Sequence, residues 1–375
     1  MSQERLREET INFAAGPAQL PYEVLTEAQK GLLNYNGHGM SILEITHRSP
    51  MFDQLNQETN DLIRTLLNVP DNYKILFLQG GGTGQFAAVP LNLTSSNEDV
   101  VDYIVTGQWS GKAAKEAEKY AKVNLVLPKQ DKYTYIPEPV QWSFSDKPRY
   151  VYYCANETVH GVEWPEIPAV GETLLVCDAS SNFLTRSMDV SSHALVYAGV
   201  QKNVGCAGLT VVIVREDLLG SVRKDCPIIW DYTTQTKMKS AYNTPNVWGI
   251  YILNLVLKWL QDNGGLEAME TNSAAKSGIL FDMIGRSEGF YSLIVEPKYR
   301  SRVNIPFRVC KDDSPNDELE AMFLKESAER GLLNLKGYRL VGGIRASLYN
   351  AVSVMDTKKL ADFMRWFYEE YKLRN

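Results

Sequence analysis

Apolar residues in the first two thirds of the chain fall into short continuous runs, separated by segments with helical spacing. The short runs predict buried strands at 74–78, 100–105, 123–127, 150–155, 174–178, 194–197 and 209–214. Helical spacing predicts helices at 21–33, 50–67, 86–93 and 113–121. Because strands that alternate with helices are typical of a parallel sheet flanked by helices, the pattern predicts an α/β fold with a mainly parallel, mostly buried sheet.

The last third of the chain has a different order of elements. A long helical region at 247–284 is interrupted by the pair Gly264-Gly265. Strands at 291–295, 303–309 and 344–348 and helices at 317–330 and 357–372 follow. This order favours a smaller α+β unit, so we expect a large domain at 15–265 and a small domain formed by 1–14 and 266–375.

Composition limits the class of protein. The 375 residues are 44% hydrophobic and 22% charged, as in ordinary globular proteins. The formal net charge of -6 argues against non-specific binding of nucleic acid. The five cysteines form no CxxC pair, which favours reduced thiols and no zinc site. The polar N-terminus resembles no secretory signal or transit peptide, and no apolar run is long enough to span a membrane. We expect a cytoplasmic protein without a metal centre.

A single lysine, Lys202, stands among small residues just after the apolar run at 194–197. An ammonium near a core must find a partner, shift its pKa or be consumed in a covalent bond. A desolvated lysine amine can form a Schiff base with an aldehyde such as that of pyridoxal phosphate (PLP). Taken alone, the segment favours a lysine in a surface turn, because a lone short motif often matches by chance.

Asp178 changes this balance. It ends the apolar run at 174–178, and the carboxyl end of a strand is where open α/β sheets place ligands. A PLP enzyme needs a carboxylate that keeps the pyridine nitrogen protonated and a lysine that holds the aldehyde. Asp178 and Lys202 can supply this pair. The alternative for Asp178 is a helix N-cap.

Three further features follow predicted strands. The glycine-rich segment at 80–85 lies between a strand and a helix, where backbone N–H groups can approach a phosphate. It matches neither a dinucleotide-binding nor an ATP-binding motif, and a tight turn is the alternative. Trp109 could stack on a flat cofactor or belong to the core. Thr158 could donate its hydroxyl to a ligand. Several polar groups at one sheet edge indicate a binding site.

Three cations could bind anionic groups of a substrate. His47 and Arg48 lie just before a helix that Ser49 caps and Pro50 begins, a favourable place for an anion. A solvated basic pair is the alternative. Arg345 heads an apolar strand, and an arginine in that setting usually meets a carboxylate. That carboxylate could belong to a substrate or to a structural salt bridge.

Six segments together resemble the phosphoserine aminotransferase family, within the class V aminotransferases. The resemblance runs from about residue 11 to the C-terminus. It is carried by Asn12-Phe13-Ala14-Ala15-Gly16-Pro17-Ala18, Glu44-Ile45-Thr46-His47-Arg48, Gly80-Gly81-Gly82-Thr83-Gly84-Gln85-Phe86, Asn156-Glu157-Thr158-Val159-His160-Gly161-Val162, Ala198-Gly199-Val200-Gln201-Lys202-Asn203 and Gly342-Gly343-Ile344-Arg345-Ala346-Ser347-Leu348-Tyr349-Asn350.

The resemblance implies the aspartate-aminotransferase-like fold (fold type I of PLP-dependent transferases) and a homodimer with active sites at the subunit interface. It implies amino transfer between L-glutamate and 3-phosphohydroxypyruvate, giving O-phospho-L-serine and 2-oxoglutarate in serine biosynthesis. The large domain would then be the PLP-binding domain.

The resemblance also assigns roles to individual residues. Lys202 would form the Schiff base, Asp178 would pair with the pyridine nitrogen, Trp109 would stack on the ring and Thr158 would bind the ring hydroxyl. The cofactor phosphate would be bound by Gly82, Thr83 and Gln201, with Asn243 and Thr244 from the other subunit. Arg345 would bind the substrate α-carboxylate. The substrate phosphate would be bound by Arg339, with His47 and Arg48 from the partner and Tyr338 nearby.

Two positions depart from part of the family. Bacterial members often have Arg where this chain has Thr83, and His where it has Tyr338, so the phosphate site here could be rearranged. Rival functions are another class V enzyme, such as an alanine–glyoxylate aminotransferase or a cysteine desulfurase, and a non-catalytic protein that acts through its dimer surface. A desulfurase needs a nucleophilic cysteine in a mobile loop, whereas Cys310 follows an apolar strand.

Overall fold

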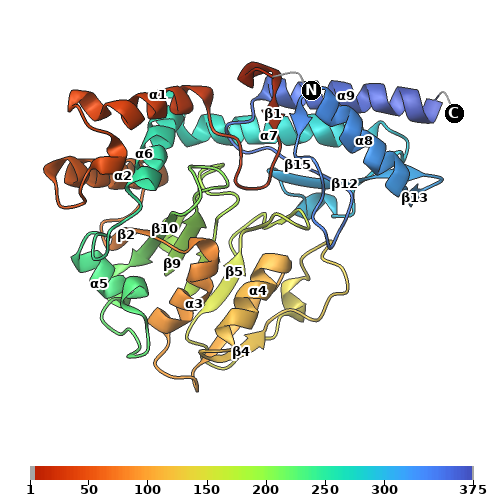
Figure 1. Ribbon diagram of the computed structural model, residues 1–375. Coiled ribbons are helices and arrows are strands. Elements are labelled where there is room, and N and C mark those ends of the chain that lie inside the picture. Colours follow the sequence, from red (N-terminus) through yellow and green to blue (C-terminus); the bar gives the residue numbers. More distant parts are fainter. Residues whose placement is uncertain (1–4, 374–375) are drawn as a thin grey trace.

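The computed structural model describes residues 5–373, and a seven-stranded sheet lies at its centre (Figure 1). The strand order is β2-β10-β9-β8-β5-β3-β4. The strands are β2 (Tyr73–Leu78), β3 (Val100–Ile104), β4 (Lys122–Leu125), β5 (Val151–Cys154), β8 (Leu175–Asp178), β9 (Leu195–Gly199) and β10 (Thr210–Arg215). β10 is antiparallel to both of its neighbours, and the remaining pairs are parallel.

The antiparallel β10 is an exception to the predicted parallel arrangement. The link from Gly199 to Thr210 is short, and a parallel neighbour needs a crossover of a dozen or more residues. The chain therefore turns back directly after β9. This tight return contains Lys202 and places it at the end of the sheet where β8 also ends.

Helices cover both faces of the sheet. They are α1 (Tyr22–Leu33), α2 (Pro50–Leu67), α3 (Gly81–Leu93), α4 (Gln108–Ala117), α5 (Tyr232–Lys237), α6 (Val247–Asp262), α7 (Gly265–Gly285), α8 (Asp317–Glu329) and α9 (Val354–Tyr368). In Figure 1, α3 and α4 lie in front of the sheet. Their apolar side chains pack with Leu76, Tyr103, Tyr152 and Tyr197 of one sheet face, whereas α2 and α6 pack with the opposite face.

The C-terminal part has a core of its own. Its sheet contains β11 (Tyr291–Ser292), β12 (Asn304–Lys311), β13 (Ser314–Pro315) and β15 (Ile344–Ser347). A separate apolar cluster joins this sheet to α7, α8 and α9, and also includes Ile11 and Phe13. The N-terminal strand β1 (Ile11–Asn12) pairs with β14 (Leu332–Leu333), so the N-terminal segment joins the C-terminal part (Figure 1).

Three helices differ from the sequence prediction. α3 begins at Gly81 rather than at 86, because the positive φ of Gly80 (104°) and Gly81 (64°) turns the chain sharply into the helix. α4 spans 108–117 rather than 113–121, because the side chain of Glu157 binds its first turn. α5 was not predicted, since its six residues are too few to show a helical period; Asp231 caps it.

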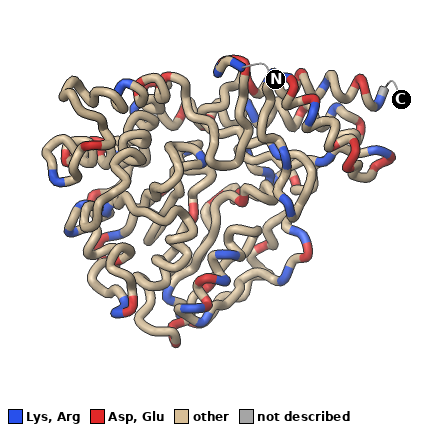
Figure 2. Tube along the Cα trace, in the orientation of Figure 1, with Lys and Arg blue, Asp and Glu red and all other residues tan. Residues whose placement is uncertain are grey.

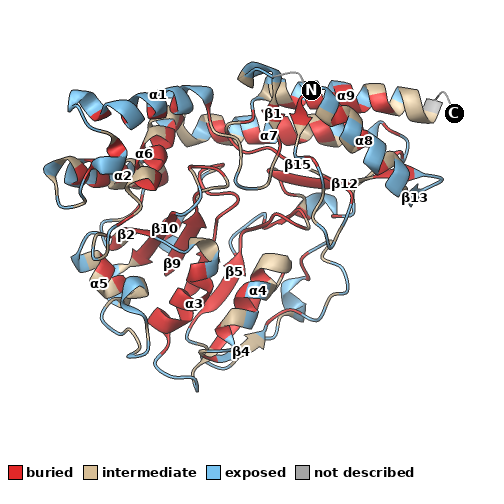
Figure 3. Cartoon of the chain, in the orientation of Figure 1, coloured by how far each residue is buried: buried red, intermediate tan, exposed pale blue. Residues whose placement is uncertain are grey.

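The central strands β5, β8 and β9 are buried throughout, whereas the edge strand β4 is partly exposed (Figure 3). Lys and Arg are intermingled with Asp and Glu over the described chain (Figure 2). Within residues 5–373, no helix is long and apolar enough to cross a membrane. The same residues contain no cluster of three or more side chains suited to bind a metal ion.

Candidate active site

The carboxyl ends of four parallel strands present the predicted site residues at one edge of the sheet. Gly82 follows β2, Trp109 follows β3, and Asp178 ends β8; Thr158 follows the two-residue strand β6 (Asn156–Glu157), which comes directly after β5. Because carboxyl ends of parallel strands meet at the same edge, their side chains can converge although they are distant in sequence. Lys202 follows β9 at this edge, so the sheet assembles five of the predicted residues.

Asp178 lies in the interior, 6% exposed. Its Oδ1 accepts a hydrogen bond from the backbone N–H of Ser180 at 2.9 Å. Its Oδ2 accepts one from the hydroxyl of Tyr197 at 3.0 Å. Two neutral donors therefore orient the Asp178 carboxylate. The residue is the last of β8 and does not cap a helix.

Lys202 lies in a tight turn with small neighbours. Its Nζ lies 5.0 Å from the centroid of the Trp109 indole ring, within reach of a cation–π interaction. Gly16, at φ 127°, packs against its stem, where a Cβ would come within 3.1 Å of the Lys202 Cγ. The backbone N–H of Ala18 also binds the carbonyl of Gln201 at 3.0 Å. The N-terminal segment therefore covers the lysine turn and holds it in place.

The first turn of α3 lies beside this lysine turn. A Cβ at Gly82 would be 3.5 Å from the Ser180 Oγ and 4.0 Å from the Asp178 Oδ2. A Cβ at Gly199 would be 3.5 Å from the backbone N of Gly82 and 3.0 Å from the Oε1 of Gln201. Gly82 and Gln201 thus line one concave surface at a helix N-terminus, a favourable place for phosphate.

Two adjacent residues, Glu157 and Thr158, hold Trp109. The Thr158 Oγ1 accepts a hydrogen bond from the indole Nε1 at 2.7 Å, and the Glu157 Oε2 accepts one from the Trp109 backbone N–H at 2.9 Å. The Glu157 Oε1 also binds the Ser110 N–H and hydroxyl at 2.8 and 2.6 Å. Burial raises the pKa of Glu157, and the Ser110 and Trp109 donors oppose this shift.

Arg345 reaches the same edge from β15. Its Nη1 donates to the backbone carbonyl of Thr158 at 3.3 Å, and its Nε has no hydrogen-bond partner among the described residues. Burial lowers the pKa of this guanidinium. It meets no carboxylate of the described chain, so the structural salt bridge that the sequence left open is absent there. A partly buried arginine with free donors is suited to bind a ligand carboxylate.

The other predicted residues are more exposed than Asp178. Arg48 and Thr244 are exposed, and His47 and Asn243 are partly exposed. The Thr244 carbonyl accepts a hydrogen bond at 3.2 Å from the side chain of Gln79, which directly follows β2. Arg339 is exposed and Tyr338 is partly buried, in a turn closed by bonds from Val341 and Gly342 to the Tyr338 carbonyl. Thr83 is partly exposed in the first turn of α3.

Residue-by-residue interpretation of the sequence missed Glu157, Ser180 and Tyr197. Glu157 and Tyr197 are polar residues within buried strands, where each must find a partner. That pattern could have marked them as members of a site. Ser180 carried no such signal: its Oγ accepts from the Gly199 N–H at 3.0 Å.

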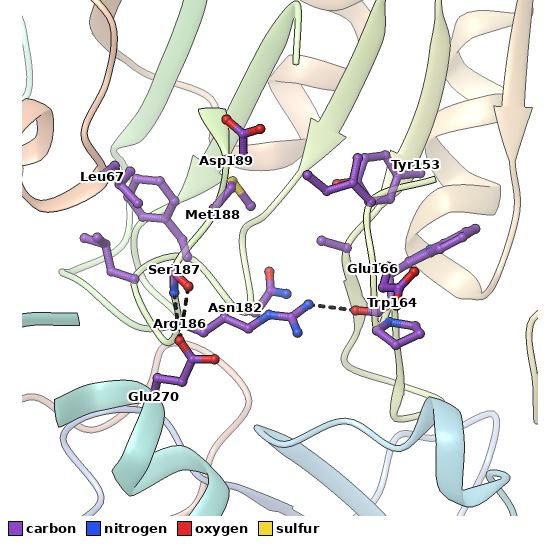
Figure 4. A pocket seen from close by; sticks show the side chains of 15 residues that line it. Leu67, Tyr153, Trp164, Glu166, Asn182, Arg186, Ser187, Met188, Asp189 and Glu270 are labelled. Carbon is purple, nitrogen blue, oxygen red and sulfur yellow. Dashed lines mark hydrogen bonds between the residues drawn. The ribbon is translucent and has the colours of Figure 1, made fainter. Parts of the chain in front are cut away.

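A cavity of about 250 Å³ lies elsewhere, between the loop after β8 and α7 (Figure 4). None of the predicted site residues lines it. Arg186 projects across it and donates to the Trp164 carbonyl at 2.7 Å, and Ser187 binds Glu270 (Figure 4). Arg186 also pairs with Glu163 at 3.5 Å, and Glu270 pairs with Arg302 at 3.7 Å, whereas Arg345 meets no carboxylate of the described chain.

Comparison with known proteins places residues 10–360 within the model of the class-V aminotransferase family. A probable phosphoserine aminotransferase from Caenorhabditis elegans is 52% identical over 97% of this chain and 98% of its own length. A phosphoserine aminotransferase from Drosophila melanogaster is 51% identical over 96% and 99%. The PLP-bound phosphoserine aminotransferase from Trichomonas vaginalis superposes with a TM-score of 0.91, at 37% identity over 95% and 99% of the two chains.

Proposed function

The chain belongs to the class-V aminotransferases, in their phosphoserine aminotransferase branch, and from this premise we propose how its residues carry out the reaction. The activity is PLP-dependent amino transfer between L-glutamate and 3-phosphohydroxypyruvate, giving O-phospho-L-serine and 2-oxoglutarate in serine biosynthesis. The observation that carries the proposal is the convergence of Asp178, Trp109 and Lys202 at one sheet edge.

The residues present fit PLP. A buried carboxylate, Asp178, can meet a protonated pyridine nitrogen, and the indole of Trp109 offers a flat surface to the ring. Gly82 leaves room beside Asp178 and Ser180 that a larger side chain would fill. Thr83 and Gln201 flank this glycine and would bind the cofactor phosphate. Within this arrangement, Thr158 would bind the ring hydroxyl.

PLP, when bound, supplies the carrier of the amino group and withdraws electrons from the substrate Cα. The chain supplies the rest. Lys202 would hold the cofactor through Nζ, and the same Nζ would accept and return the proton of the substrate Cα. The Asp178 carboxylate would meet the ring nitrogen and favour its protonated form. Trp109 would offer its indole to the ring and exclude water from it.

Substrate binding falls to the cations. Arg345 binds the α-carboxylate that all four substrates and products share, through donors that the protein leaves free. Arg339 and Tyr338, with His47 and Arg48 of the other subunit, bind the phosphate or the side-chain carboxylate of glutamate. Because Thr83 and Tyr338 replace an arginine and a histidine common in bacterial members, we assign more of the phosphate binding to Arg48 and Arg339.

Exposed apolar residues support a homodimer with active sites at its interface. They lie near His47 and Arg48 and near Asn243 and Thr244, the residues proposed to act in the other subunit. They include Leu33 (80% exposed), Leu43 (62%), Ile228 (49%), Ile229 (42%), Met238 (50%) and Tyr242 (44%). The two regions adjoin on the left of Figure 1, where the Asn56 side chain donates to the Lys239 carbonyl at 3.0 Å. Apolar surface of this kind favours a second copy of the chain as its partner.

The remaining assignments complete the proposal. We assign the large PLP-binding domain to 15–265 and the small domain to 1–14 and 266–375. The packing of Ile11 and Phe13 with the C-terminal cluster supports the grouping of the N-terminal segment with the small domain. The protein would act in the cytoplasm.

The test is the visible absorbance of the purified holoenzyme. O-phospho-L-serine should abolish the colour of the bound cofactor, and 2-oxoglutarate should restore it. L-alanine is the matched control and should have little effect. Loss of colour with L-alanine but not with O-phospho-L-serine would assign the chain to another aminotransferase, and a Lys202→Ala variant that cycles normally would overturn the role of that lysine.

A further inference from the structure

Two buried tyrosines extend inward from the carboxylate of Asp178. Asp178 on β8 and Tyr197 on β9 are register partners in neighbouring parallel strands, so their side chains project from the same face. The Tyr197 hydroxyl donates to the Asp178 Oδ2 at 3.0 Å. The Tyr152 hydroxyl lies 2.8 Å from the Tyr197 hydroxyl. Both tyrosines are at most 1% exposed, so both hydroxyls are shielded from bulk solvent.

The charge of Asp178 fixes the direction of this chain of hydrogen bonds. An ionised carboxylate can only accept, so Tyr197 must use its single O–H on Asp178. The Tyr197 oxygen can then only accept from Tyr152, and both protons of the chain point toward the carboxylate. If Asp178 were protonated, this order would no longer be required. The arrangement therefore favours the anionic form.

The tyrosines are stable donors. Burial raises the pKa of both hydroxyls well above the ordinary value of 10, and the charge of Asp178 raises them further. Each therefore keeps its proton at any working pH. Other ionisable groups near Asp178 are Glu157, Cys154 and Cys177, and burial, with a smaller contribution from the Asp178 charge, raises the pKa of each.

We propose that Tyr197 and, through it, Tyr152 are positioning residues that keep Asp178 anionic and correctly oriented toward the cofactor nitrogen. Hydrogen bonds in a row polarise one another, so the second tyrosine strengthens the donor that the first presents. This inference rests on the proposed role of Asp178. Under this proposal, the buried tyrosines behind Asp178, and not only the residues that contact the cofactor, influence the proton affinity of the cofactor ring.

The test follows Asp178 and the cofactor separately. The carboxyl pKa of Asp178 is measured in the full-length apoprotein by ¹³C NMR, assigned with Asp178→Asn. The second readout is the dissociation constant of PLP, and the third is the ring protonation of ¹⁵N-labelled cofactor in the holoenzyme. In Tyr197→Phe, we expect the Asp178 pKa to rise by about one unit, because one of its donors is lost, and PLP to bind about tenfold more weakly.

Tyr152, the second tyrosine of the chain of hydrogen bonds, should act on Asp178 only through Tyr197. Tyr152→Phe should produce a smaller rise in the Asp178 pKa and about a twofold weaker PLP affinity, because only the polarisation is lost. In the Tyr197→Phe background, Tyr152→Phe should change neither quantity further. This non-additivity separates a chain of hydrogen bonds from two independent packing effects. Tyr152→Phe also keeps the proposal testable if Tyr197→Phe fails to fold.

Tyr103 provides the matched control. It is fully buried, its hydroxyl lies 2.9 Å from that of Tyr150, and its ring stacks on Tyr152 with centroids 4.6 Å apart. Tyr103→Phe removes an equivalent hydrogen bond with no contact to Asp178. It should lower the unfolding temperature without changing the Asp178 pKa.

Two results would overturn the proposal: an unchanged Asp178 pKa in Tyr197→Phe, or an equal shift in Tyr103→Phe. Failure of the proposed function has a different signature. If Asp178 does not contact the cofactor nitrogen, Asp178→Asn should leave the PLP dissociation constant unchanged, even where Tyr197→Phe shifts the carboxyl pKa.

Discussion

The carboxylate of Glu157 accepts a hydrogen bond from the backbone N–H of Trp109 at 2.9 Å, so a strand-end side chain fixes the start of the helix that carries the indole. The adjacent Thr158 binds the indole nitrogen, and its carbonyl accepts from Arg345. One dipeptide therefore positions both the ring expected to cover the cofactor and the cation expected to bind the substrate. Although the Glu157 carboxylate is buried, a change at Glu157 should therefore disturb the position of Trp109.

We predict that Glu157→Gln weakens PLP binding about tenfold. Both oxygens of Glu157 accept from backbone N–H groups, and the glutamine NH₂ would replace one of these oxygens with a second donor. The loss of these buried, charge-assisted bonds should lower the free energy of unfolding by about 3 kcal/mol. Urea unfolding and PLP titration measure the two effects. Ser110→Ala is the graded control, because it removes the hydroxyl bond to Glu157 and the bonds that the hydroxyl accepts from the N–H groups of Thr106 and Gly107, and leaves the Trp109 bond. Equal PLP affinity in Glu157→Gln and wild type would contradict the prediction.

The sequence predicted the family, the α/β class and the PLP cofactor, and the comparisons confirm all three. Strand-end residues such as Asp178 were predictable, because buried parallel strands are continuous apolar runs and their ends are easy to locate. The first turn of α4 was not. Its start depends on Glu157, 48 residues away from the Trp109 that it binds, and no local pattern encodes such a contact.

Local sequence patterns also could not predict the direction of β10 or the hydrogen bond between Tyr197 and Asp178. Strand direction depended on the length of the link at 199–210, and the bond depended on register between neighbouring strands. The roles of the site residues stay predictions, and the following variants test them.

We predict that Arg345→Ala lowers kcat/KM for both L-glutamate and O-phospho-L-serine by about 100- to 1000-fold, the usual effect of removing one partner of a buried charge pair. Arg345→Lys should recover part of this loss, because it keeps the charge but not the planar fork. Steady-state kinetics with each substrate measures both.

Arg308→Lys is the control for Arg345. Arg308 lies on the neighbouring strand and is bound to Glu320 at 2.6 Å, so it should affect stability and not KM. A loss confined to one of the two substrates would show that Arg345 binds the distal group instead of the α-carboxylate.

Lys276 gives the protein a predicted pH dependence of stability. Its Nζ donates to the carbonyls of Leu348, Tyr349 and Val352 at 2.9, 2.8 and 2.8 Å, which holds the segment after β15. Burial lowers the pKa of Lys276 from 10.5 to about 7, and Asp356 opposes the shift. Above pH 7 the folded protein releases a proton that the unfolded chain keeps until about pH 10.5, so the free energy of unfolding should rise with pH in this window.

We predict that this free energy rises by about 2 kcal/mol between pH 7 and 9 in the wild type relative to Lys276→Met. Below pH 7 both states are protonated, so the difference between the two proteins should be constant there. Urea unfolding at pH 6, 7, 8 and 9 provides the measurement. A difference that is flat across pH 7–9 would show that the three carbonyls keep the amine protonated despite its burial.

The proposed interface site predicts complementation between inactive subunits. Arg48 is exposed in its own chain, whereas Lys202, Trp109, Thr158 and Arg345 are connected within one chain. A hybrid dimer of one Arg48→Ala subunit and one Lys202→Ala subunit should then contain one intact site, built from Lys202 of the first subunit and Arg48 of the second. Its kcat/KM at low substrate concentration should be about half that of the wild-type dimer.

The control hybrid combines Arg345→Ala with Lys202→Ala. Arg345 reaches the Thr158 carbonyl of its own chain, so each site of this hybrid takes Arg345 and Lys202 from the same subunit. One site then lacks Arg345 and the other lacks Lys202, and activity should not return. Co-expression with two affinity tags isolates each hybrid, and coupled assays compare them. If neither hybrid regains activity, Arg48 acts in its own subunit or not at all; if both do, Arg345 also crosses the interface, which its bond to Thr158 opposes.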